Sequence, residues 1–520
     1  MTGREASAAP MPERGPAGRA ARGVFSNAGL NLAASLLPLP LALVTVPAVI
    51  RGFGIERYGV LATAGVVLAY LALLDVGLGR ASTRFLARLL DANAATVAET
   101  FWTVAALAAA IGVAGGVAML AVAGPLARRV LQIPPELAAD AEAAFRALAL
   151  AAPFVVLLPA LLGALEARRR FDLVAAISVP TAALGLLAPL AVLPWTTRLL
   201  PVVVAIAAVQ CAACAVTLAV CRRAMPEIRG AARPRFRVVR ALLGYGRWVA
   251  VSNVVGPLMV NADRLVIGAV LSVRAVGFYA APYDLVTRLS LVPSSMMRAL
   301  FPLFSADRSA DVREARRLAV DGARAIALVM GPLAALIVAL APDLLRLWLG
   351  AEFAARSHAV LQLLAVGVTV NAVAMVPFWL LQGIGRPDVC AKFHVLELVL
   401  YVPLLLALLR WQGITGAALA WTIRVGLDGA LLLAATHRLV GAAEHGGAVR
   451  RLAAFGAVLV AALTAAWLVA GSGAGAAPRV AGAALLAAAT AVTGWLVVLR
   501  GDERTAVASA IRARVWRGSR

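Results

Sequence analysis

The sequence predicts an all-α integral membrane protein with about fourteen transmembrane helices, arranged as two six-helix lobes from an internal repeat plus two C-terminal helices. Three observations predict this fold class. The 520-residue chain contains about fourteen apolar stretches long enough to cross a bilayer, which takes roughly 20 residues each. It is 62% hydrophobic and only 14% charged, whereas soluble domains carry about 25% charged residues. Its two halves also resemble each other at a constant spacing.

The expected helices are the apolar runs between short basic or turn-rich breaks. A transmembrane β-barrel would instead show alternating segments of about ten residues, so every run is assigned as a helix. The expected helices cover residues 24–50, 59–79, 101–124, 145–165, 171–193, 199–221, 244–271, 277–304, 320–342, 358–382, 391–409, 413–436, 452–470 and 480–499.

These helices group into lobes joined by a linker, and basic tails flank them. The N-terminal tail is rich in Ala, Pro, Gly and Arg, a composition typical of disordered segments. The expected parts are a disordered tail (1–23), an N-terminal lobe with helices 1–6 (24–222), a basic linker (223–243), a C-terminal lobe with helices 7–12 (244–437), helices 13–14 (438–500) and a basic tail (501–520).

The positive charges alternate along the chain. The net charge is +23, and Lys and Arg gather on alternate loops and on both tails. Cytoplasmic loops of membrane proteins carry such an excess, so both termini are expected in the cytoplasm, with the chain crossing the bacterial cytoplasmic (inner) membrane many times. The basic balance therefore does not indicate nucleic-acid binding.

An internal repeat relates the two lobes. Three segments of the first half resemble segments of the second at offsets of 217 or 218 residues. Six helices per unit give both copies the same orientation, with a symmetry axis along the membrane normal. Two such lobes can rock about a central site, which is alternating access. The matched positions are Gly59 with Gly277, Pro125 with Pro342, and Arg168 with Arg386.

Three sequence runs carry a family resemblance: LLDVGLGRASTRFLARLL (73–90), VNADRLVIGAVLSVRAVGFYAAPYDLVTRL (260–289) and LLRLWLGAEF (344–353). With them, the chain resembles the polysaccharide flippases of the multidrug/oligosaccharidyl-lipid/polysaccharide exporter superfamily, from about residue 24 to 500. The resemblance implies a MATE-like fold. It also implies transport of a lipid-linked oligosaccharide, usually on a polyprenyl diphosphate, for surface polysaccharide or lipopolysaccharide biosynthesis. The sugar would cross between the lobes while the lipid tail stays in the bilayer. Partners would be membrane lipids and other polysaccharide-assembly proteins.

Two other functions stay open. One is a drug or metabolite exporter of the same superfamily driven by Na⁺ or H⁺, and such a coupling cation is also the only cofactor that we keep open for a flippase. The other is a membrane-embedded polysaccharide polymerase or ligase, but the longest expected outer segment, 125–146, offers no nucleophile or metal-ligand set. We therefore expect no enzyme, no catalytic residue and no metal site. The CxxC pair, Cys211 and Cys214, is interpreted as apolar packing because no His lies near it.

Charged residues within apolar helices are expensive and mark candidate sites. Asp263 and Arg264 lie in helix 7, and Asp284 and Arg288 lie in helix 8. A short turn makes these helices antiparallel neighbours, so the side chains are expected to meet. They could lock the two helices together, or the arginines could bind the diphosphate and sugar acids of a substrate while the carboxylates take part in coupling.

A second charged group lies in helices 11 and 12. Arg424 is near the middle of helix 12 with Asp428 one turn on, and Glu397 is near the cytoplasmic end of helix 11 beside His394. Arg424 is a candidate substrate ligand. Asp428 and Glu397 are candidates for coupling or helix pairing, with a snorkelling or capping role for Glu397 as the alternative.

The first lobe offers weaker candidates. Asp75, Arg80 and Arg84 lie where helix 2 leaves the membrane, and they either anchor the helix end or contact the entering diphosphate. Asn31 in helix 1 is a candidate cavity residue. Helix 1 is expected to bend at a hinge because proline removes a backbone hydrogen bond. The hinge candidates are Pro38, Pro40 and Pro47, with Gly256 and Pro257 at the matching depth of helix 7.

Overall fold

The computed structural model describes residues 38–75, 77–89, 93–230, 235, 239, 258–259, 261–304, 312–441, 446–473, 475–499 and 504–505. These residues form helices joined by short turns and no β-strand. In the first lobe the elements are α2 (Pro38–Phe53), α3 (Ile55–Leu73), α4 (Leu78–Ala87), α5 (Ala94–Pro125), η1 (Leu126–Val130), α6 (Pro135–Ala167), α7 (Phe171–Val192), α8 (Leu199–Ala224) and η2 (Pro226–Arg229).

The second lobe continues from the helical residues 258–259 and 261–270. Its further elements are α10 (Val273–Thr287), η3 (Arg288–Ser290), α11 (Leu291–Phe304), α12 (Val312–Leu349), α13 (Ala351–Gly383), α14 (Pro387–Gln412) and α15 (Ile414–Val440), followed by the terminal pair α16 (Gly446–Gly471) and α17 (Ala476–Val498).

The expected multi-pass membrane fold is confirmed. Within the described ranges, eleven helices are long and apolar enough to cross a membrane, and they match expected helices 2–6 and 9–14. Expected helix 1 is α2, which is described from Pro38 onward. Expected helix 7 is described only in part, and expected helix 8 is divided into α10, the 3₁₀ turn η3 and α11.

The prediction of a long outer segment at 125–146 is wrong. Most of it is helical: α5 continues through η1 to Val130, and α6 begins at Pro135, so only 131–134 remain as the turn. Pro134 and Pro135 start α6 because proline suits the first turn of a helix, where its missing N–H costs nothing. Most polar side chains of this segment lie on the extended helix ends of η1 and α6.

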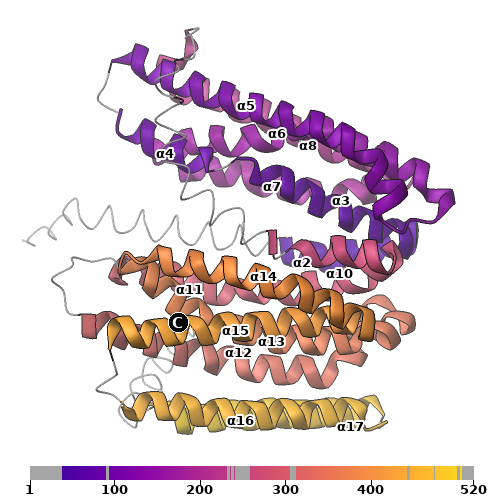
Figure 1. Cartoon of the computed structure of the whole chain (residues 1–520), viewed down its shortest axis with the longest axis vertical. Helices are drawn as coiled ribbons and strands as arrows, with labels where there is room; N and C mark the ends of the chain where they lie inside the picture. The colour runs from indigo at the N-terminus through magenta and orange to yellow at the C-terminus, as the bar shows by residue number, and fades with distance from the viewer. Residues whose placement is uncertain are drawn as a thin grey trace, which may run out of the picture.

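The repeat is visible in the spacing of the helices. Corresponding helices of the two lobes begin 215–218 residues apart, and in Figure 1 the lobes lie as two stacked groups with α16 and α17 along one edge. The corresponding starts are Ile55 and Val273, Ala94 and Val312, Pro135 and Ala351, Phe171 and Pro387, and Leu199 and Ile414.

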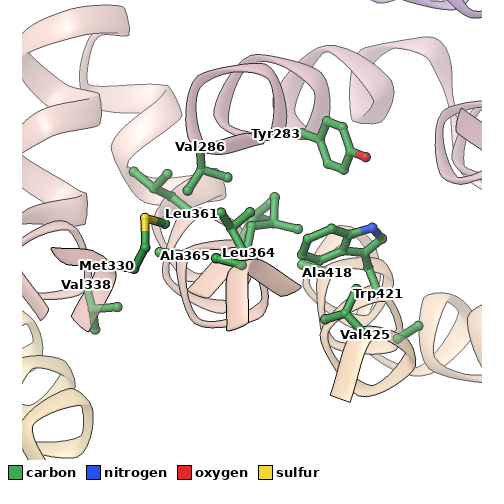
Figure 2. Close-up of a cluster of buried hydrophobic side chains, with 14 of the residues drawn as sticks. Tyr283, Val286, Met330, Val338, Leu361, Leu364, Ala365, Ala418, Trp421 and Val425 are labelled. Carbon is green, nitrogen blue, oxygen red and sulfur yellow. The ribbon is translucent and has the colours of Figure 1, made fainter. Parts of the chain in front are cut away.

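The second lobe has the larger core. Side chains of α10, α12, α13 and α15 gather there, and Figure 2 shows Trp421 and Val425 close to Leu364. Tyr283 meets the Trp421 ring edge-on, with ring centroids 6.0 Å apart. Small residues allow close helix approach, which is how helices associate in lipid: a Cβ on Gly367 would lie 2.6 Å from the Trp421 ring.

The lobes touch backbone to backbone where α3 and α10 begin. A Cβ on Gly59 would lie 1.8 Å from the carbonyl oxygen of Val273, and a Cβ on Gly277 would lie 2.9 Å from that of Ile55. The backbone N–H of Gln132 also donates to the carbonyl of Gly268, at 2.9 Å. The repeat therefore brings its own matched glycines, Gly59 and Gly277, together between the lobes.

Polar contacts near both ends of α17 hold the terminal helices against α12. Arg479 of α17 pairs with Asp343 at 2.7 Å. At the other end, the buried guanidinium of Arg324 donates to the carbonyl of Val498. That carbonyl belongs to the last turn of α17, where no intrahelical partner exists. Both terminal helices therefore pack against α12 of the second lobe.

Candidate functional site: the cavity between the lobes

A cavity of about 270 Å³ lies between the two lobes. Its walls are mostly apolar and come from both lobes, and three of its lining residues are charged: Arg264, Asp284 and Arg288. The other lining residues are Ala42, Leu43, Thr45, Val46, Val49, Tyr58, Leu61, Ala62, Ala64, Gly65, Leu68, Leu148, Gly185, Leu186, Pro189, Val203, Ile206, Leu285 and Trp348.

Arg264 and Asp284 form an ion pair across the turn between expected helices 7 and 8, as the sequence predicted. The Arg264 side chain is 12% exposed and that of Asp284 is 39% exposed, so the carboxylate is the more open partner. The Arg264 guanidinium also lies 5.2 Å from the centroid of the Tyr283 ring, a cation–π contact. The pair fixes the arginine in the cavity wall and leaves a carboxylate facing the cavity.

Asp263 does not share in this pairing, and here the structure differs from the expectation. Its carboxylate is buried in the second lobe and accepts hydrogen bonds from Tyr279, at 2.6 Å, and from Tyr401. Neighbouring residues on a helix point about 100° apart, so Arg264 turns to the cavity while Asp263 turns inward. Asp263 therefore joins expected helices 7, 8 and 11.

Arg288 is the cavity cation without a carboxylate partner among the described residues. It is half-buried in the turn η3, where α10 gives way to α11, and it lines the cavity one turn from Asp284. With Arg264 already neutralised by Asp284, Arg288 leaves the wall with one net positive charge. A buried guanidinium keeps its proton and can hold two phosphate or carboxylate oxygens at once.

Arg424 lies inside the second lobe and does not line this cavity. It pairs with Glu397 of α14 at 3.2 Å, and its guanidinium lies 5.6 Å from the centroid of the Tyr401 ring. The Glu397 side chain is fully buried, which excludes the snorkelling alternative. Asp428, one turn further along α15, lies next to Glu397.

His394 and Glu397, neighbours on α14, make no direct hydrogen bond with each other in the described structure. His394 stacks on Phe378, with ring centroids 5.9 Å apart, and its Nδ1 atom is buried without a partner. Glu397 Oε1 and Asp428 Oδ1 are likewise buried and receive no N–H or hydroxyl donor, and the two carboxyl groups lie within hydrogen-bond reach of each other. These unsatisfied atoms make this cluster a place where a proton or small cation could bind.

The first-lobe candidates lie away from the cavity. Asp75 accepts hydrogen bonds from the backbone N–H of Gly79, at 3.1 Å, and so caps the start of α4. Arg80 and Arg84 lie on the exposed face of α4. The structure gives no contact between these three residues and the cavity, and their role with a diphosphate stays a prediction.

Some candidates fall outside the described residues, namely Asn31, Gly256 and Pro257. The other hinge candidates lie in α2. Pro38 and Pro40 are in its first described turn, and Pro47 is inside it and buried. Pro47 cannot donate to the carbonyl of Leu43. The chemical condition for a bend at Pro47 is thus present, and the bend itself stays a prediction.

The sequence reasoning missed three aromatic residues of the site: Tyr58 in the cavity wall, and Tyr279 and Tyr401 around Asp263. A tyrosine in a lipid-spanning helix needs a hydrogen-bond partner for its hydroxyl, and that signal could have identified them. No group of three or more His, Cys, Asp or Glu able to hold a metal occurs in the described part of the chain. Cys214 instead donates to the carbonyl of Phe154, at 3.3 Å.

Comparisons with known proteins place this architecture in a family. Residues 51–358, which run through both lobes, match the model of the family described as "Polysaccharide biosynthesis protein". The chain belongs to this family, a polysaccharide flippase family of the multidrug/oligosaccharidyl-lipid/polysaccharide exporter superfamily. A Shigella flexneri protein named "Putative O-antigen transporter" is 26% identical over 409 residues, which cover 79% of this chain and 96% of that protein.

Two solved structures share the fold. The lipid II flippase MurJ in an inward closed conformation superposes with a TM-score of 0.66 and 11% identity, covering 92% of this chain and 99% of that one. An inward-facing MATE family multidrug resistance transporter gives a TM-score of 0.65 and 17% identity, covering 79% of this chain and 98% of that one. The member described here is accordingly a flippase-type membrane transporter and not an enzyme.

Proposed function

We propose that this flippase moves a lipid-linked oligosaccharide, carried on a polyprenyl diphosphate, across the bacterial cytoplasmic membrane for surface polysaccharide biosynthesis. One observation carries the proposal: Arg288 and the Arg264–Asp284 pair face an apolar cavity that both lobes line. The family relationship and the named transporter relative support the same class of cargo.

The cavity chemistry suits an anionic head group. Arg288 has no carboxylate partner in the described residues, so an incoming diphosphate would neutralise it at little cost. Asp284 is partly exposed and could release Arg264 to the same anion. Thr45 and Tyr58 add hydroxyl groups to the wall, and such groups can bond to sugar hydroxyls.

The lobe contacts support alternating access. The lobes meet at the end where α3 and α10 begin. We infer that this end faces outside the cell and that both termini lie in the cytoplasm, because Lys and Arg gather on alternate loops and on both tails. The buried cluster of Glu397 and Asp428 is our candidate for a coupling proton or Na⁺, because the two carboxyl groups lie side by side and each has a buried oxygen that receives no N–H or hydroxyl donor. Tyr401 connects this cluster to Asp263, the neighbour of Arg264 in the cavity wall.

Reconstituted proteoliposomes test the proposal. The assay measures the movement of a fluorescent polyprenyl-diphosphate oligosaccharide from the leaflet that corresponds to the cytoplasmic side to the opposite leaflet. Arg288→Ala should slow movement about tenfold or more, since a hydrogen bond to a charged group contributes about 1.5–3 kcal/mol. Arg288→Lys should retain part of the rate, and Arg410→Ala, an exposed arginine at the end of α14, is the matched control. Equal rates for Arg288→Ala and Arg410→Ala would contradict the proposed anion site.

A cation-coupled exporter of drugs or metabolites is the second candidate. The observation that favours it is Asp284, whose 39% exposed carboxylate faces an apolar cavity and could bind a lipophilic organic cation. The same proteoliposomes loaded with such a cation distinguish the two. Cation efflux that Asp284→Asn abolishes, without movement of the lipid-linked sugar, would favour the exporter.

A further inference from the structure

Three arginines gather at one place on the inferred outer side of the first lobe. Arg128 and Arg129 lie in η1, the π-helical turn that continues α5, and Arg146 lies on the neighbouring helix α6. All three are exposed. Outer segments of membrane proteins usually contain few arginines, because positive charge is kept on the cytoplasmic side. A cluster of arginines on the outer side is therefore a candidate binding site.

A buried carboxylate holds two of these arginines. The Glu142 side chain is only 8% exposed, whereas those of Arg128 and Arg146 are 62% and 58% exposed. One Glu142 oxygen pairs with Arg128 Nε, and the other pairs with Arg146 Nη2 at 2.5 Å. Gly124 of α5 makes room for this carboxylate, since a Cβ there would lie 3.3 Å from Glu142 Oε1. Glu142 thus orients two guanidinium groups that belong to different elements.

The two guanidinium groups keep most of their hydrogen-bond donors available. An arginine side chain carries five N–H donors in a planar fork. Arg128 and Arg146 each direct part of this fork at Glu142, and neither makes a further ion pair within the described part of the chain. Guanidinium forks bind phosphate oxygens well, because each fork can hold two oxygens at once. The pair therefore offers a place for one phosphate group.

The charge balance favours an anion at this place. Asp140 of α6 is occupied elsewhere, because it accepts a hydrogen bond from the backbone N–H of Leu199 at 2.7 Å. Glu136 lies ten residues before Arg146, which is about 15 Å along the helix. Glu142 is then the carboxylate that faces the three arginines among the described residues of η1 and α6. Positive charge exceeds negative charge there.

The surface next to the arginines is apolar. Leu150 lies one helical turn from Arg146 on the same face of α6, and it is 68% exposed. Val117 and Leu120 of α5 are at least half exposed. A cationic pair at the inferred membrane interface above an exposed apolar surface matches an amphiphile with an anionic head and acyl chains.

We propose that Arg128 and Arg146, oriented by Glu142, bind the phosphate of an anionic phospholipid in the outer leaflet, and that its acyl chains lie on the exposed faces of α5 and α6. None of these three residues belongs to the described lining of the cavity between the lobes. In Figure 1, α5 runs along the side of the first lobe that faces away from the second. A phospholipid reaches this face from the surrounding bilayer, so the inference goes beyond the proposed function and does not depend on it.

Site-specific photocrosslinking tests the occupant. Full-length protein with Leu150→p-benzoylphenylalanine is placed in phosphatidylethanolamine vesicles that contain a trace of radiolabelled phosphatidylglycerol or, separately, phosphatidylcholine. The ratio of phosphatidylglycerol to phosphatidylcholine labelling should be about fivefold higher at Leu150 than at Leu485 of α17, since charge-assisted hydrogen bonds are the stronger ones. Leu485 is 71% exposed and lies at the same depth below the expected outer helix start, at 480 as against 145. Equal ratios at the two positions would overturn the proposal.

Substitutions in the same vesicles test the arginines. Arg128→Gln combined with Arg146→Gln should lower the ratio at Leu150 to that at Leu485, because both charged donors are lost. Arg410→Gln removes an exposed arginine from the last turn of α14 and is the matched control, which should keep the wild-type ratio. A wild-type ratio in the double variant would overturn the proposal.

Glu142→Gln distinguishes a built site from general attraction. The substitution keeps the size of the side chain and raises the local positive charge, but it releases the two guanidinium groups. The ratio at Leu150 should fall several-fold, while labelling at Leu485 stays unchanged and shows that the variant is inserted. A ratio at Leu150 equal to or above that of the wild type would show general electrostatic attraction and overturn the role of Glu142.

A last measurement separates a phospholipid from the carrier lipid of the proposed cargo. Radiolabelled polyprenyl diphosphate, at the same trace amount, should label Leu150 no more than phosphatidylglycerol does. Stronger labelling by polyprenyl diphosphate would assign the site to the carrier lipid and overturn the phospholipid proposal. Transport of the lipid-linked oligosaccharide is measured separately, so failure of the proposed function would leave this result unchanged.

Discussion

The close contact between α3 and α10 predicts that Gly59→Ala pushes the two helices apart. The added methyl group would lie 1.8 Å from the carbonyl oxygen of Val273, where ordinary contact begins at 3.4 Å, so the two backbones must separate by about 1.6 Å. Overpacking of this kind costs about 1–3 kcal/mol. Replacing a helix glycine by alanine gains about 0.8–1.0 kcal/mol. Because the obstacle is backbone and cannot rotate away, the contact cost should prevail.

Subtracting the gain leaves up to about 2 kcal/mol against the closed contact, which changes the open-to-closed ratio by up to about 30-fold. The assay uses Leu61→Cys, a cavity residue of α3, in a background without the four native cysteines. A membrane-impermeant maleimide is applied from the side on which α3 begins. Gly59→Ala should raise the labelling rate by that factor. Gly426→Ala is the control, since nothing lies within 4 Å of its added methyl group. Equal labelling rates in the two variants would refute the reasoning.

Two further predictions concern ion pairs. Glu397→Gln should strongly lower the thermal stability of the purified protein, because leaving Arg424 buried without its partner costs about 3–5 kcal/mol. Adding Arg424→Met to this variant should recover much of the lost stability. No recovery in the double variant would contradict the pairing. In η2, the 3₁₀ turn after α8, burial opposes ionisation of Glu227, but hydrogen bonds from its own backbone N–H and from Arg168 outweigh burial and lower its pKa. A lowered carboxylate pKa stabilises the fold above the usual value of 4.5 and loses that effect as pH falls, so the melting temperature of Glu227→Gln should approach that of the wild type below pH 4.5. A constant difference at all pH values would contradict this.

The sequence by itself determined the membrane class, most of the helices and the repeat. Apolar length is read directly along the chain, because the bilayer sets it and every backbone group must bond within its own helix. Contacts between helices that follow each other in the sequence could also be predicted. The Arg264–Asp284 pair was predictable because a two-residue turn fixes its helices side by side.

Only the tertiary structure decided which side chains face the cavity. Tyr401 reaches Asp263 over 138 positions, and Trp348 reaches Leu43 over 305. In a soluble helix the apolar face marks the buried side, but in lipid both the lobe interior and the outer surface are apolar, so the pattern does not distinguish them. This is why Arg424, a candidate cavity ligand by sequence, lies instead against Glu397 inside a lobe. The rotation of α15 and the packing of the second lobe decide which way Arg424 points. Both depend on contacts between residues that are far apart in the sequence.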